Sequence, residues 1–194
     1  MIVFLGDSIT QWWDVEYFNH YFGMYKPVNL GMAGHTSRDT RQYLELSHFN
    51  NLKPSKVVLQ IGTNDGDHHM STGETVANIQ QICKAILEHS PDSKVLLIGP
   101  LPRGELPSNR HRIYNREVNK LLRKADRDPK VTYVDISIMF FKEDEVISKN
   151  VMHDFLHLTK LGYHILSEIV SEFLFSSTQS HMLASAPAPL PRLS

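Results

Sequence analysis

Short apolar runs alternate with longer amphipathic segments along most of this sequence, and this alternation constrains the fold more than any other feature. The runs Val57-Val58-Leu59 and Val95-Leu96-Leu97-Ile98 are continuously apolar rather than alternating. Strands of this kind are buried on both faces, as they are in parallel sheets that helices cover. Strands are therefore expected at 2–5, 28–30, 56–61, 94–98 and 132–134.

The segments between these runs have the length and spacing of helices. Apolar residues recur every three or four positions in 72–89, 109–125 and 161–175, which is typical of helices with one buried face. The repeated strand–helix order predicts right-handed crossovers. We therefore expect an α/β fold, a three-layer α/β/α sandwich with a five-stranded parallel sheet in the flavodoxin-like order 2-1-3-4-5. The domain is expected over 1–175, followed at 176–194 by a mobile tail rich in Ser, Ala and Pro.

Composition and charge argue against several classes of protein. The formal net charge is −1, so no global positive field attracts nucleic acid. No apolar run is long enough to span a bilayer, and no leader precedes the first expected strand, so a cytoplasmic location is expected. The single cysteine, Cys83, lies among apolar residues at helical spacing and is interpreted as a buried structural thiol.

The first motif that can carry chemistry is Gly6-Asp7-Ser8, directly after the first expected strand and before a helix expected over 10–22. Glycine allows a sharp turn from strand to helix, which places the serine at the edge of the sheet. Its hydroxyl can act as a nucleophile, and its N–H can donate to a developing oxyanion. The simpler alternative is that Asp7, Ser8 and Thr10 only cap the helix.

Two further motifs follow the second and third expected strands and offer oxyanion donors. Gly34 lies in the glycine-rich segment 29–36, where the backbone can approach a ligand closely or simply form a turn. Asn64 carries a side-chain amide, a neutral donor that suits an oxyanion. The neighbouring Asp65 and Asp67 could cap the next helix or hold a cation, although one short acidic loop is weak evidence for a metal.

The fourth motif, Asp154-x-x-His157, precedes the last expected helix. Residues three apart in a turn or helix share a face, so Asp154 can accept a hydrogen bond from one nitrogen of His157. The other nitrogen is then free to take a proton from a serine, although a structural surface pair is the alternative. His153 and His157 also have a spacing that metal ligands use, but the sequence offers no obvious third ligand.

In this order, the four motifs resemble the conserved blocks of the SGNH (GDSL-like) hydrolases over nearly the whole of the expected domain. The resemblance implies that Ser8 is the nucleophile and that Asp154 and His157 complete a catalytic triad. It also implies an oxyanion hole formed by the N–H groups of Ser8 and Gly34 and by the amide of Asn64.

Within that family, the sequence looks most like the catalytic subunits of the intracellular platelet-activating-factor acetylhydrolases. The likeness lies in the segments 62–64, 101–107 and 152–159. Two departures stand near the expected substrate mouth. At 33–35 the sequence has Ala-Gly-His where those enzymes favour Gly-Gly-Asp, and Asp65 stands where they carry a second Asn.

The resemblance implies a serine esterase that hydrolyses short-chain acyl esters, above all acetyl esters, through an acyl-enzyme and without a metal or other cofactor. In the similar acetylhydrolases, the positions of Ile9 and Leu156 flank the acyl methyl group, so two bulky aliphatic side chains predict a short acyl pocket. The expected partner is a small-molecule ester, either a lipid or an acetylated metabolite. A homodimer is possible by analogy with those subunits.

Several large side chains have two interpretations at this stage. Arg103, Arg110 and Arg112 could meet a phosphate or carboxylate on the leaving group, or form a solvated face. Trp12 and Trp13 could line the cleft or a protein interface, although core packing is the simpler account for at least one of them.

Two other classes of function stay open. One is a non-catalytic binding module on the same fold, which a serine-directed phosphonate would fail to label. The other is a metal-dependent hydrolase that uses His153, His157 and either Asp65 or Asp67, which a chelator would inactivate.

Overall fold

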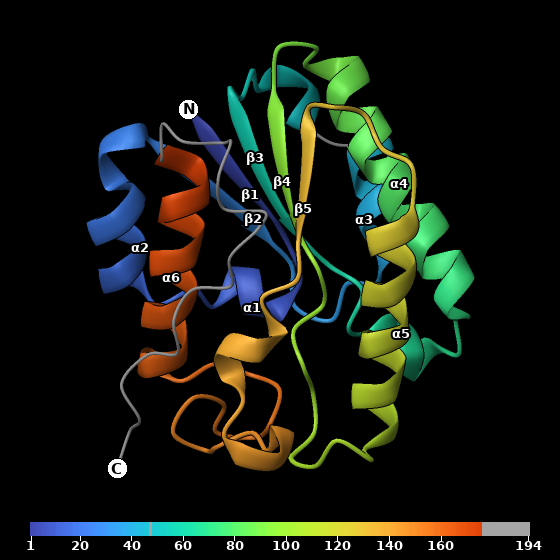
Figure 1. The fold of residues 1–194 in the computed structure, drawn as a ribbon. Coiled ribbons are helices and arrows are strands. Elements are labelled where there is room, and N and C mark those ends of the chain that lie inside the picture. The colour runs from blue at the N-terminus through green and yellow to red at the C-terminus, as the bar shows by residue number, and fades with distance from the viewer. Residues whose placement is uncertain (47, 176–194) are drawn as a thin grey trace.

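In the computed structural model, five parallel strands form the middle layer of the molecule (Figure 1). The structure describes residues 1–46 and 48–175. The strands are β1 (Ile2–Gly6), β2 (Pro27–Gly31), β3 (Lys56–Gln60), β4 (Lys94–Ile98) and β5 (Val131–Val134). Their order in the sheet is β2-β1-β3-β4-β5, and each neighbouring pair is parallel. The predicted strand order is therefore confirmed. The predicted tail at 176–194 lies outside the described residues.

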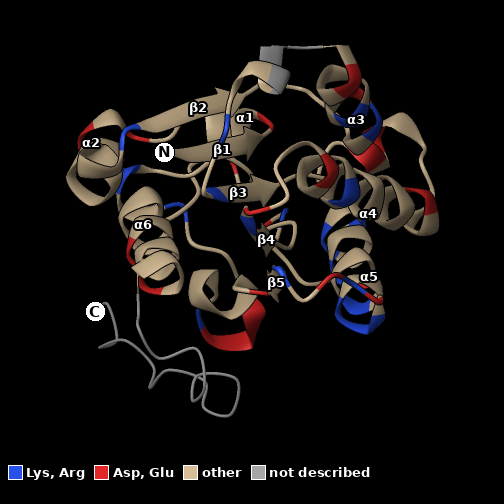
Figure 2. Cartoon of the chain, turned by 90° about the horizontal axis from the view of Figure 1, so that it is seen from above, with Lys and Arg blue, Asp and Glu red and all other residues tan. Residues whose placement is uncertain are grey.

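Helices cover both faces of this sheet, which confirms the three-layer sandwich (Figure 1). The α-helices are α1 (Ser8–Gln11), α2 (Val15–Phe22), α3 (Ser37–Leu46), α4 (Thr72–His89), α5 (Arg110–Lys124) and α6 (Lys160–Phe175). The short 3₁₀ helices are η1 (Gly23–Tyr25), η2 (His48–Asn51), η3 (Asp65–His68), η4 (Ser137–Phe140) and η5 (Glu143–Glu145). Viewed along the sheet, α2 and α6 lie on one side, and α3, α4 and α5 lie on the other (Figure 2).

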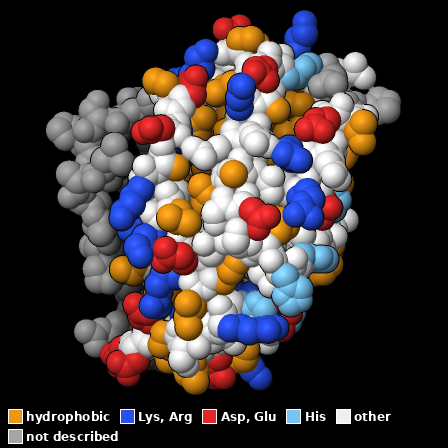
Figure 3. All heavy atoms as spheres, turned by 90° about the vertical axis from the view of Figure 1, so that its right-hand side faces the viewer, with side chains coloured by type: hydrophobic (Ala, Val, Ile, Leu, Met, Phe, Trp, Pro, Cys, Tyr) orange, Lys and Arg blue, Asp and Glu red, His pale blue; other side chains and the backbone are white. Residues whose placement is uncertain are grey.

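Each face of the sheet buries its own apolar cluster, which is why the strands are continuously apolar. Phe4, Val58 and Leu96 belong to the cluster that also holds residues of α6. Leu5 and Leu59 belong to the cluster that also holds residues of α4 and α5. On the outer surface of α3, α4 and α5, charged side chains of both signs are mixed with small apolar areas (Figure 3). The helices thus have an apolar inner face and a largely polar outer face, as their amphipathic spacing predicts.

The helix expected over 10–22 is interrupted, and this part of the prediction is wrong. Asp14 begins a new helix, because its carboxylate accepts the N–H groups of Glu16 and Tyr17, each at 3.1 Å. The interruption lets Trp13 turn into the core, where its indole N–H donates to Ser167 Oγ at 2.8 Å. Core packing is therefore confirmed for Trp13 and does not apply to Trp12, which is 52% exposed.

Two further expectations about the chain can be compared with the fold. Cys83 is buried on α4, as predicted, and burial raises the pKa of its thiol to about 12, which makes it a poor nucleophile. Across 1–46 and 48–175, the fold contains no helix with the length and apolar character needed to cross a membrane.

Candidate active site

Ser8 is the first residue of α1 and stands where β1 ends. Asp7 caps this short helix, with its Oδ1 accepting the N–H of Ile9 at 2.9 Å. Gly6 permits the tight turn, because a β-carbon there would lie 2.3 Å from both the Gln60 carbonyl oxygen and Thr10 Oγ1. A larger residue at Gly6 would therefore push apart β3 and α1, and with them the serine.

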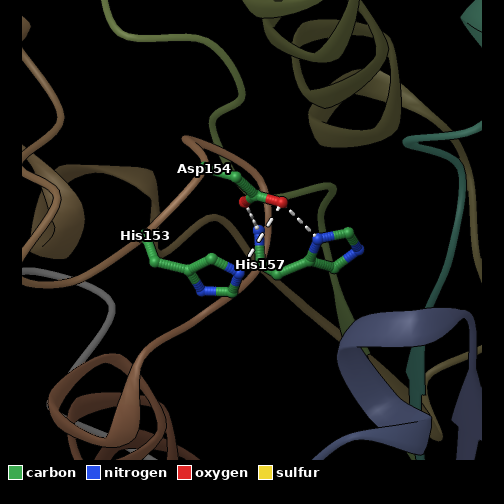
Figure 4. A group of neighbouring side chains, drawn as sticks. All are labelled: His153, Asp154 and His157. Atoms are coloured by element: carbon green, nitrogen blue, oxygen red, sulfur yellow. Dashed lines mark hydrogen bonds and ion pairs between the residues drawn. The ribbon is translucent and has the colours of Figure 1, made fainter.

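Ser8, His157 and Asp154 form one chain of hydrogen bonds. Ser8 Oγ lies 3.1 Å from His157 Nε2, and His157 Nδ1 lies 2.7 Å from Asp154 Oδ2. Figure 4 shows the Asp154 carboxylate facing the Nδ1 side of the His157 ring. Because an ionised carboxylate can only accept, Nδ1 carries the proton and Nε2 is left as an acceptor toward the serine. The three predicted residues are therefore brought together in the geometry that serine catalysis requires.

The Asp154 carboxylate is held in place by its own loop. Its Oδ1 accepts the backbone N–H groups of Leu156 at 3.0 Å and His157 at 2.7 Å. Partial burial by itself raises the pKa of Asp154. The hydrogen bonds from the His157 backbone, the His157 ring and the Leu156 backbone outweigh burial and lower the pKa to about 2. Asp154 is thus ionised at neutral pH and fixes the orientation and tautomer of His157.

The strand order brings the two other glycine- and asparagine-containing loops to either side of Ser8. β1 lies between β2 and β3 in the sheet, so the loops that follow these three strands leave the same edge side by side. Asn64 Nδ2 donates to the His35 carbonyl oxygen at 3.0 Å, and the Met32 N–H donates to the Gly6 carbonyl oxygen at 2.9 Å. Gly34 has a φ of +80°, in the left-handed region that favours glycine. The loops of Ser8, Gly34 and Asn64 therefore form one connected edge.

The comparisons with known proteins agree with this geometry. The model of the GDSL-like lipase/acylhydrolase family matches residues 4–165, which include every residue of the hydrogen-bonded chain. The chain belongs to this family. A bovine platelet-activating factor acetylhydrolase IB subunit alpha1 is 32% identical over 193 residues, covering 98% of this chain and 82% of the relative. The rat alpha2 subunit is 35% identical over 176 residues, covering 89% of this chain and 75% of the relative.

Solved structures show the same fold. A GDSL-like lipase from Bacteroides thetaiotaomicron has a TM-score of 0.70 at 23% identity, covering 89% of this chain and 86% of that one. An acetylxylan esterase from Geobacillus stearothermophilus has a TM-score of 0.69 at 19% identity, covering 87% and 91%. At these identities the likeness concerns the fold alone.

The two acidic residues next to Asn64 have structural partners in this GDSL-like acylhydrolase. Asp65 is fully buried and accepts from the Ser37 N–H at 2.8 Å, from the Ser37 hydroxyl, and from Thr75 Oγ1 at 2.7 Å. Asp67 pairs with Arg103 at 2.6 Å. Neither residue caps α4, because Ser71 does so. Asp65 instead ties the Asn64 loop to α3 and α4, a role that sequence analysis missed because the partners are distant in the chain.

The arginines of the segment after β4 are also engaged within the protein. Arg112 is 1% exposed and donates to the carbonyl oxygens of Arg103, Gly104, Glu105 and Glu145. The suggestion that Arg112 meets the leaving group is therefore wrong, because its guanidinium stabilises the backbone of this loop. Arg110 is exposed, and its Nε lies 3.2 Å from a ring nitrogen of His111.

Two aromatic rings lie next to the ring of His157. The Trp12 ring centroid is 4.7 Å from that of His157, and the His153 ring stacks on His157 at 6.1 Å. Trp12, which the sequence offered as a candidate for the cleft, directly follows α1 and is four residues after Ser8, about one helical turn away. Its exposed indole provides an apolar surface beside His157.

Asp7 is a buried acid next to Ser8. Its side chain is fully buried, and its Oδ2 has no hydrogen-bond partner among the described residues. Burial raises the pKa of Asp7 to about 7, against the lowering effect of the Ile9 N–H, and the charge of Asp65 raises it further. The folded protein therefore holds a proton on Asp7 at mildly acidic pH.

We expect Asp7 to make the free energy of unfolding fall as the pH rises from about 4 to about 7. In that window the folded state keeps the Asp7 proton, whereas the unfolded chain, with a pKa of 3.8, has released it. The slope from one such group is at most about 1.4 kcal/mol per pH unit, and it vanishes above the folded pKa. Asp7→Asn should remove this contribution, as measured by urea unfolding at pH 5 and pH 7, whereas the exposed control Asp92→Asn should keep it. If the free energy of unfolding differs between pH 5 and pH 7 by the same amount in Asp7→Asn as in the wild type, Asp7 does not titrate in this range.

Proposed function

We propose that this GDSL-like acylhydrolase is a serine esterase in which Ser8 is the nucleophile, His157 the general base and Asp154 the residue that orients it. The observation that carries the proposal is the continuous chain of hydrogen bonds from Ser8 Oγ through both ring nitrogens of His157 to Asp154 Oδ2, at 3.1 Å and 2.7 Å. The membership of the family supports the same class of reaction.

The reaction proceeds in two halves through an acyl-enzyme. His157 Nε2 takes the Ser8 proton as Oγ attacks the ester carbonyl carbon, and the carbonyl oxygen becomes an oxyanion. The bond to the leaving oxygen then breaks, and His157 returns its proton to the departing alcohol. Water attacks the acyl-enzyme in the same way, with His157 again as base, and releases the carboxylic acid and free Ser8.

The oxyanion hole is proposed to consist of the N–H groups of Ser8 and Gly34 and the side-chain amide of Asn64. The Asn64 amide has two hydrogens, and the bond to the His35 carbonyl oxygen uses one of them. That bond fixes the amide plane and leaves the second hydrogen for the substrate. The donor is thereby aligned before the charge develops, which is the condition for effective stabilisation.

Asn64→Ala should lower kcat by roughly 10²–10³-fold, because one oxyanion donor is removed. KM should change little, since the interaction forms mainly in the transition state. Steady-state kinetics on p-nitrophenyl acetate measure both constants, with circular dichroism as the control for folding. A folded variant with wild-type kcat would remove Asn64 from the oxyanion hole.

The acyl group is proposed to be short, with acetyl preferred. Ile9 directly follows the proposed nucleophile in the chain, and Leu156 directly precedes the proposed base. Ile9 is buried in the cluster between the sheet and α6, and Leu156 packs against the same cluster. The bovine relative is an acetylhydrolase subunit, and a structural neighbour is an acetylxylan esterase.

p-Nitrophenyl acetate should therefore have a higher kcat/KM than the octanoyl ester. Leu156→Ala should shift this ratio toward the longer ester by about 10-fold or more, because a methylene group in a shaped apolar pocket is worth about 1–3 kcal/mol. The control is Ile138→Ala, an exposed apolar residue outside the site, which should leave the ratio unchanged. Faster hydrolysis of octanoyl or longer esters by the wild type would refute the short pocket.

The serine mechanism and its alternatives are separated by one experiment. Hydrolysis of p-nitrophenyl acetate is measured for the wild type and Ser8→Ala, each with and without a chelator. Turnover by the wild type in chelator, and its loss in a folded Ser8→Ala, would support the serine esterase. Loss of wild-type activity in chelator would favour a metal-dependent hydrolase, although Asp65 and Asp67 are already engaged with Ser37, Thr75 and Arg103. A folded Ser8→Ala with full activity would contradict the proposal.

A small ester as the substrate, a homodimer and a cytoplasmic location stay predictions from the sequence.

A further inference from the structure

Three potential metal ligands meet at the outer side of the catalytic base. Ligand atoms of His153, Asp154 and His157 all lie within 4.8 Å of one another, and in the described part of the chain no other group of three or more His, Cys, Asp or Glu side chains does so. His153 Nε2 is 3.8 Å from Asp154 Oδ2, and His157 Nδ1 is 2.7 Å from the same oxygen. Figure 4 shows the two rings directed toward one carboxylate. Sequence analysis found the histidine spacing but not Asp154 as the third ligand.

The group is accessible to ions in solution. The side chains of His153 and Asp154 are 62% and 44% exposed, and that of His157 is 20% exposed. The His153 backbone N–H donates to the His157 carbonyl oxygen at 3.2 Å, so the two histidines are anchored to one another through the loop backbone. His153 has no part in the proposed reaction. Its ring nitrogen can therefore bind a metal ion without removing a group that the reaction uses.

The three ligand atoms lie within 4.8 Å of one another, so the side chains must move before the atoms can surround a zinc ion. Zinc binds imidazole nitrogen and carboxylate oxygen at about 2.0–2.2 Å in a tetrahedron, which puts neighbouring ligand atoms about 3.3 Å apart. The Asp154–His157 contact at 2.7 Å would widen, and the His153–Asp154 contact at 3.8 Å would shorten, each by roughly half an ångström. Two imidazoles, one carboxylate and a water molecule form a ligand set that zinc accepts.

We propose that Zn²⁺ binds His153, Asp154 and Nδ1 of His157, and that it inhibits the esterase by occupying the base. This inference rests on the proposed function for its inhibitory half. A neutral imidazole has one ring proton, which Asp154 keeps on Nδ1 in the active form. When zinc takes the Nδ1 lone pair, that proton moves to Nε2, and no proton is gained or lost by the ring. Nε2 then faces Ser8 as a donor and cannot accept the serine proton.

Zinc binding is tested first without reference to activity. Isothermal titration with ZnCl₂ is performed on the full chain as wild type, Ser8→Ala, His153→Phe and His164→Phe. Phe keeps an aromatic ring at 153 but removes the ligand nitrogen. His164 is the matched control, since its Nε2 lies 3.8 Å from a Glu168 oxygen without a second histidine in the group.

One equivalent of zinc should bind the wild type, Ser8→Ala and His164→Phe with the same affinity. In metal sites, removing a residue that only hydrogen-bonds to a ligand weakens metal affinity by about 10–100-fold. Removing a ligand itself, as in His153→Phe, should therefore weaken zinc binding by at least about tenfold. Equal zinc affinity in His153→Phe and the wild type would overturn the site. Because Ser8→Ala binds zinc without a nucleophile, this result stands even if the esterase proposal fails.

Inhibition is then measured with p-nitrophenyl acetate. His153→Phe should have wild-type activity in chelator and should need at least about tenfold more zinc for half-inhibition. Inhibition of the wild type should reverse on addition of chelator. Activation by zinc, or inhibition that is equal in His153→Phe and the wild type, would overturn the inhibitory role.

Discussion

His157→Ala should remain folded and should lose kcat for ester hydrolysis by about 10⁶-fold. His157 Nε2 lies 3.1 Å from Ser8 Oγ and is the proposed acceptor for its proton. Without it, the serine has the reactivity of an ordinary alcohol, and only substrate binding and the oxyanion donors continue to act. Turnover of p-nitrophenyl acetate, measured against a heat-inactivated blank, gives the loss.

Two controls separate this effect from damage to the fold. The midpoint of thermal unfolding should change little, because His157 is 20% exposed and belongs to neither apolar core cluster. Added imidazole should partly restore turnover, since the vacated space lies between Ser8 and Asp154 and can admit the free base. A folded variant that keeps more than a few per cent of wild-type kcat would exclude His157 as the base.

Asp154→Asn should lower kcat by about 10⁴-fold while keeping the loop conformation. The asparagine oxygen can replace Oδ1 as acceptor for the N–H groups of Leu156 and His157. Its NH₂ group then stands where Oδ2 accepts from Nδ1 of His157. A donor at that place forces the His157 proton onto Nε2, so the base faces Ser8 in the wrong tautomer.

The double variant tests whether the two residues act as a unit. Asp154→Asn combined with His157→Ala should have nearly the same kcat as His157→Ala alone, because Asp154 acts only through the ring it orients. Independent losses, which would multiply, would mean that Asp154 contributes to catalysis by another route.

Much of the fold was predictable because strands that are buried on both faces of a sheet have continuously apolar sequences. The continuous runs at Val57-Val58-Leu59 and Val95-Leu96-Leu97-Ile98 became β3 and β4, with their side chains divided between two apolar clusters. The pairing of Asp154 with His157 was also predictable, since both lie in one loop three residues apart. By contrast, Ser8 and His157 are 149 residues apart, and only the family resemblance and the strand order brought them together.

The failures at Arg112 and Asp65 arise because partners on other elements and loops decide the role of a buried polar residue. Arg112 had the sequence signature of a surface arginine, but the carbonyl oxygens at 103–105 and at Glu145 hold it inside. Asp65 similarly depends on Ser37 and Thr75, which belong to other elements. The break between α1 and α2 was missed because Trp13 has apolar character that suits either a continuous helix or a turn into the core.

Covalent labelling tests directly whether Ser8 is the nucleophile. The full chain is treated with a fluorophosphonate, and the adduct is located by peptide mass spectrometry in the wild type, Ser8→Ala and His157→Ala. One equivalent of label is expected on Ser8 in the wild type and none in Ser8→Ala, and labelling should be slower by orders of magnitude in His157→Ala. A wild-type protein that hydrolyses esters but carries no label on Ser8 would contradict the assignment of Ser8 as the nucleophile.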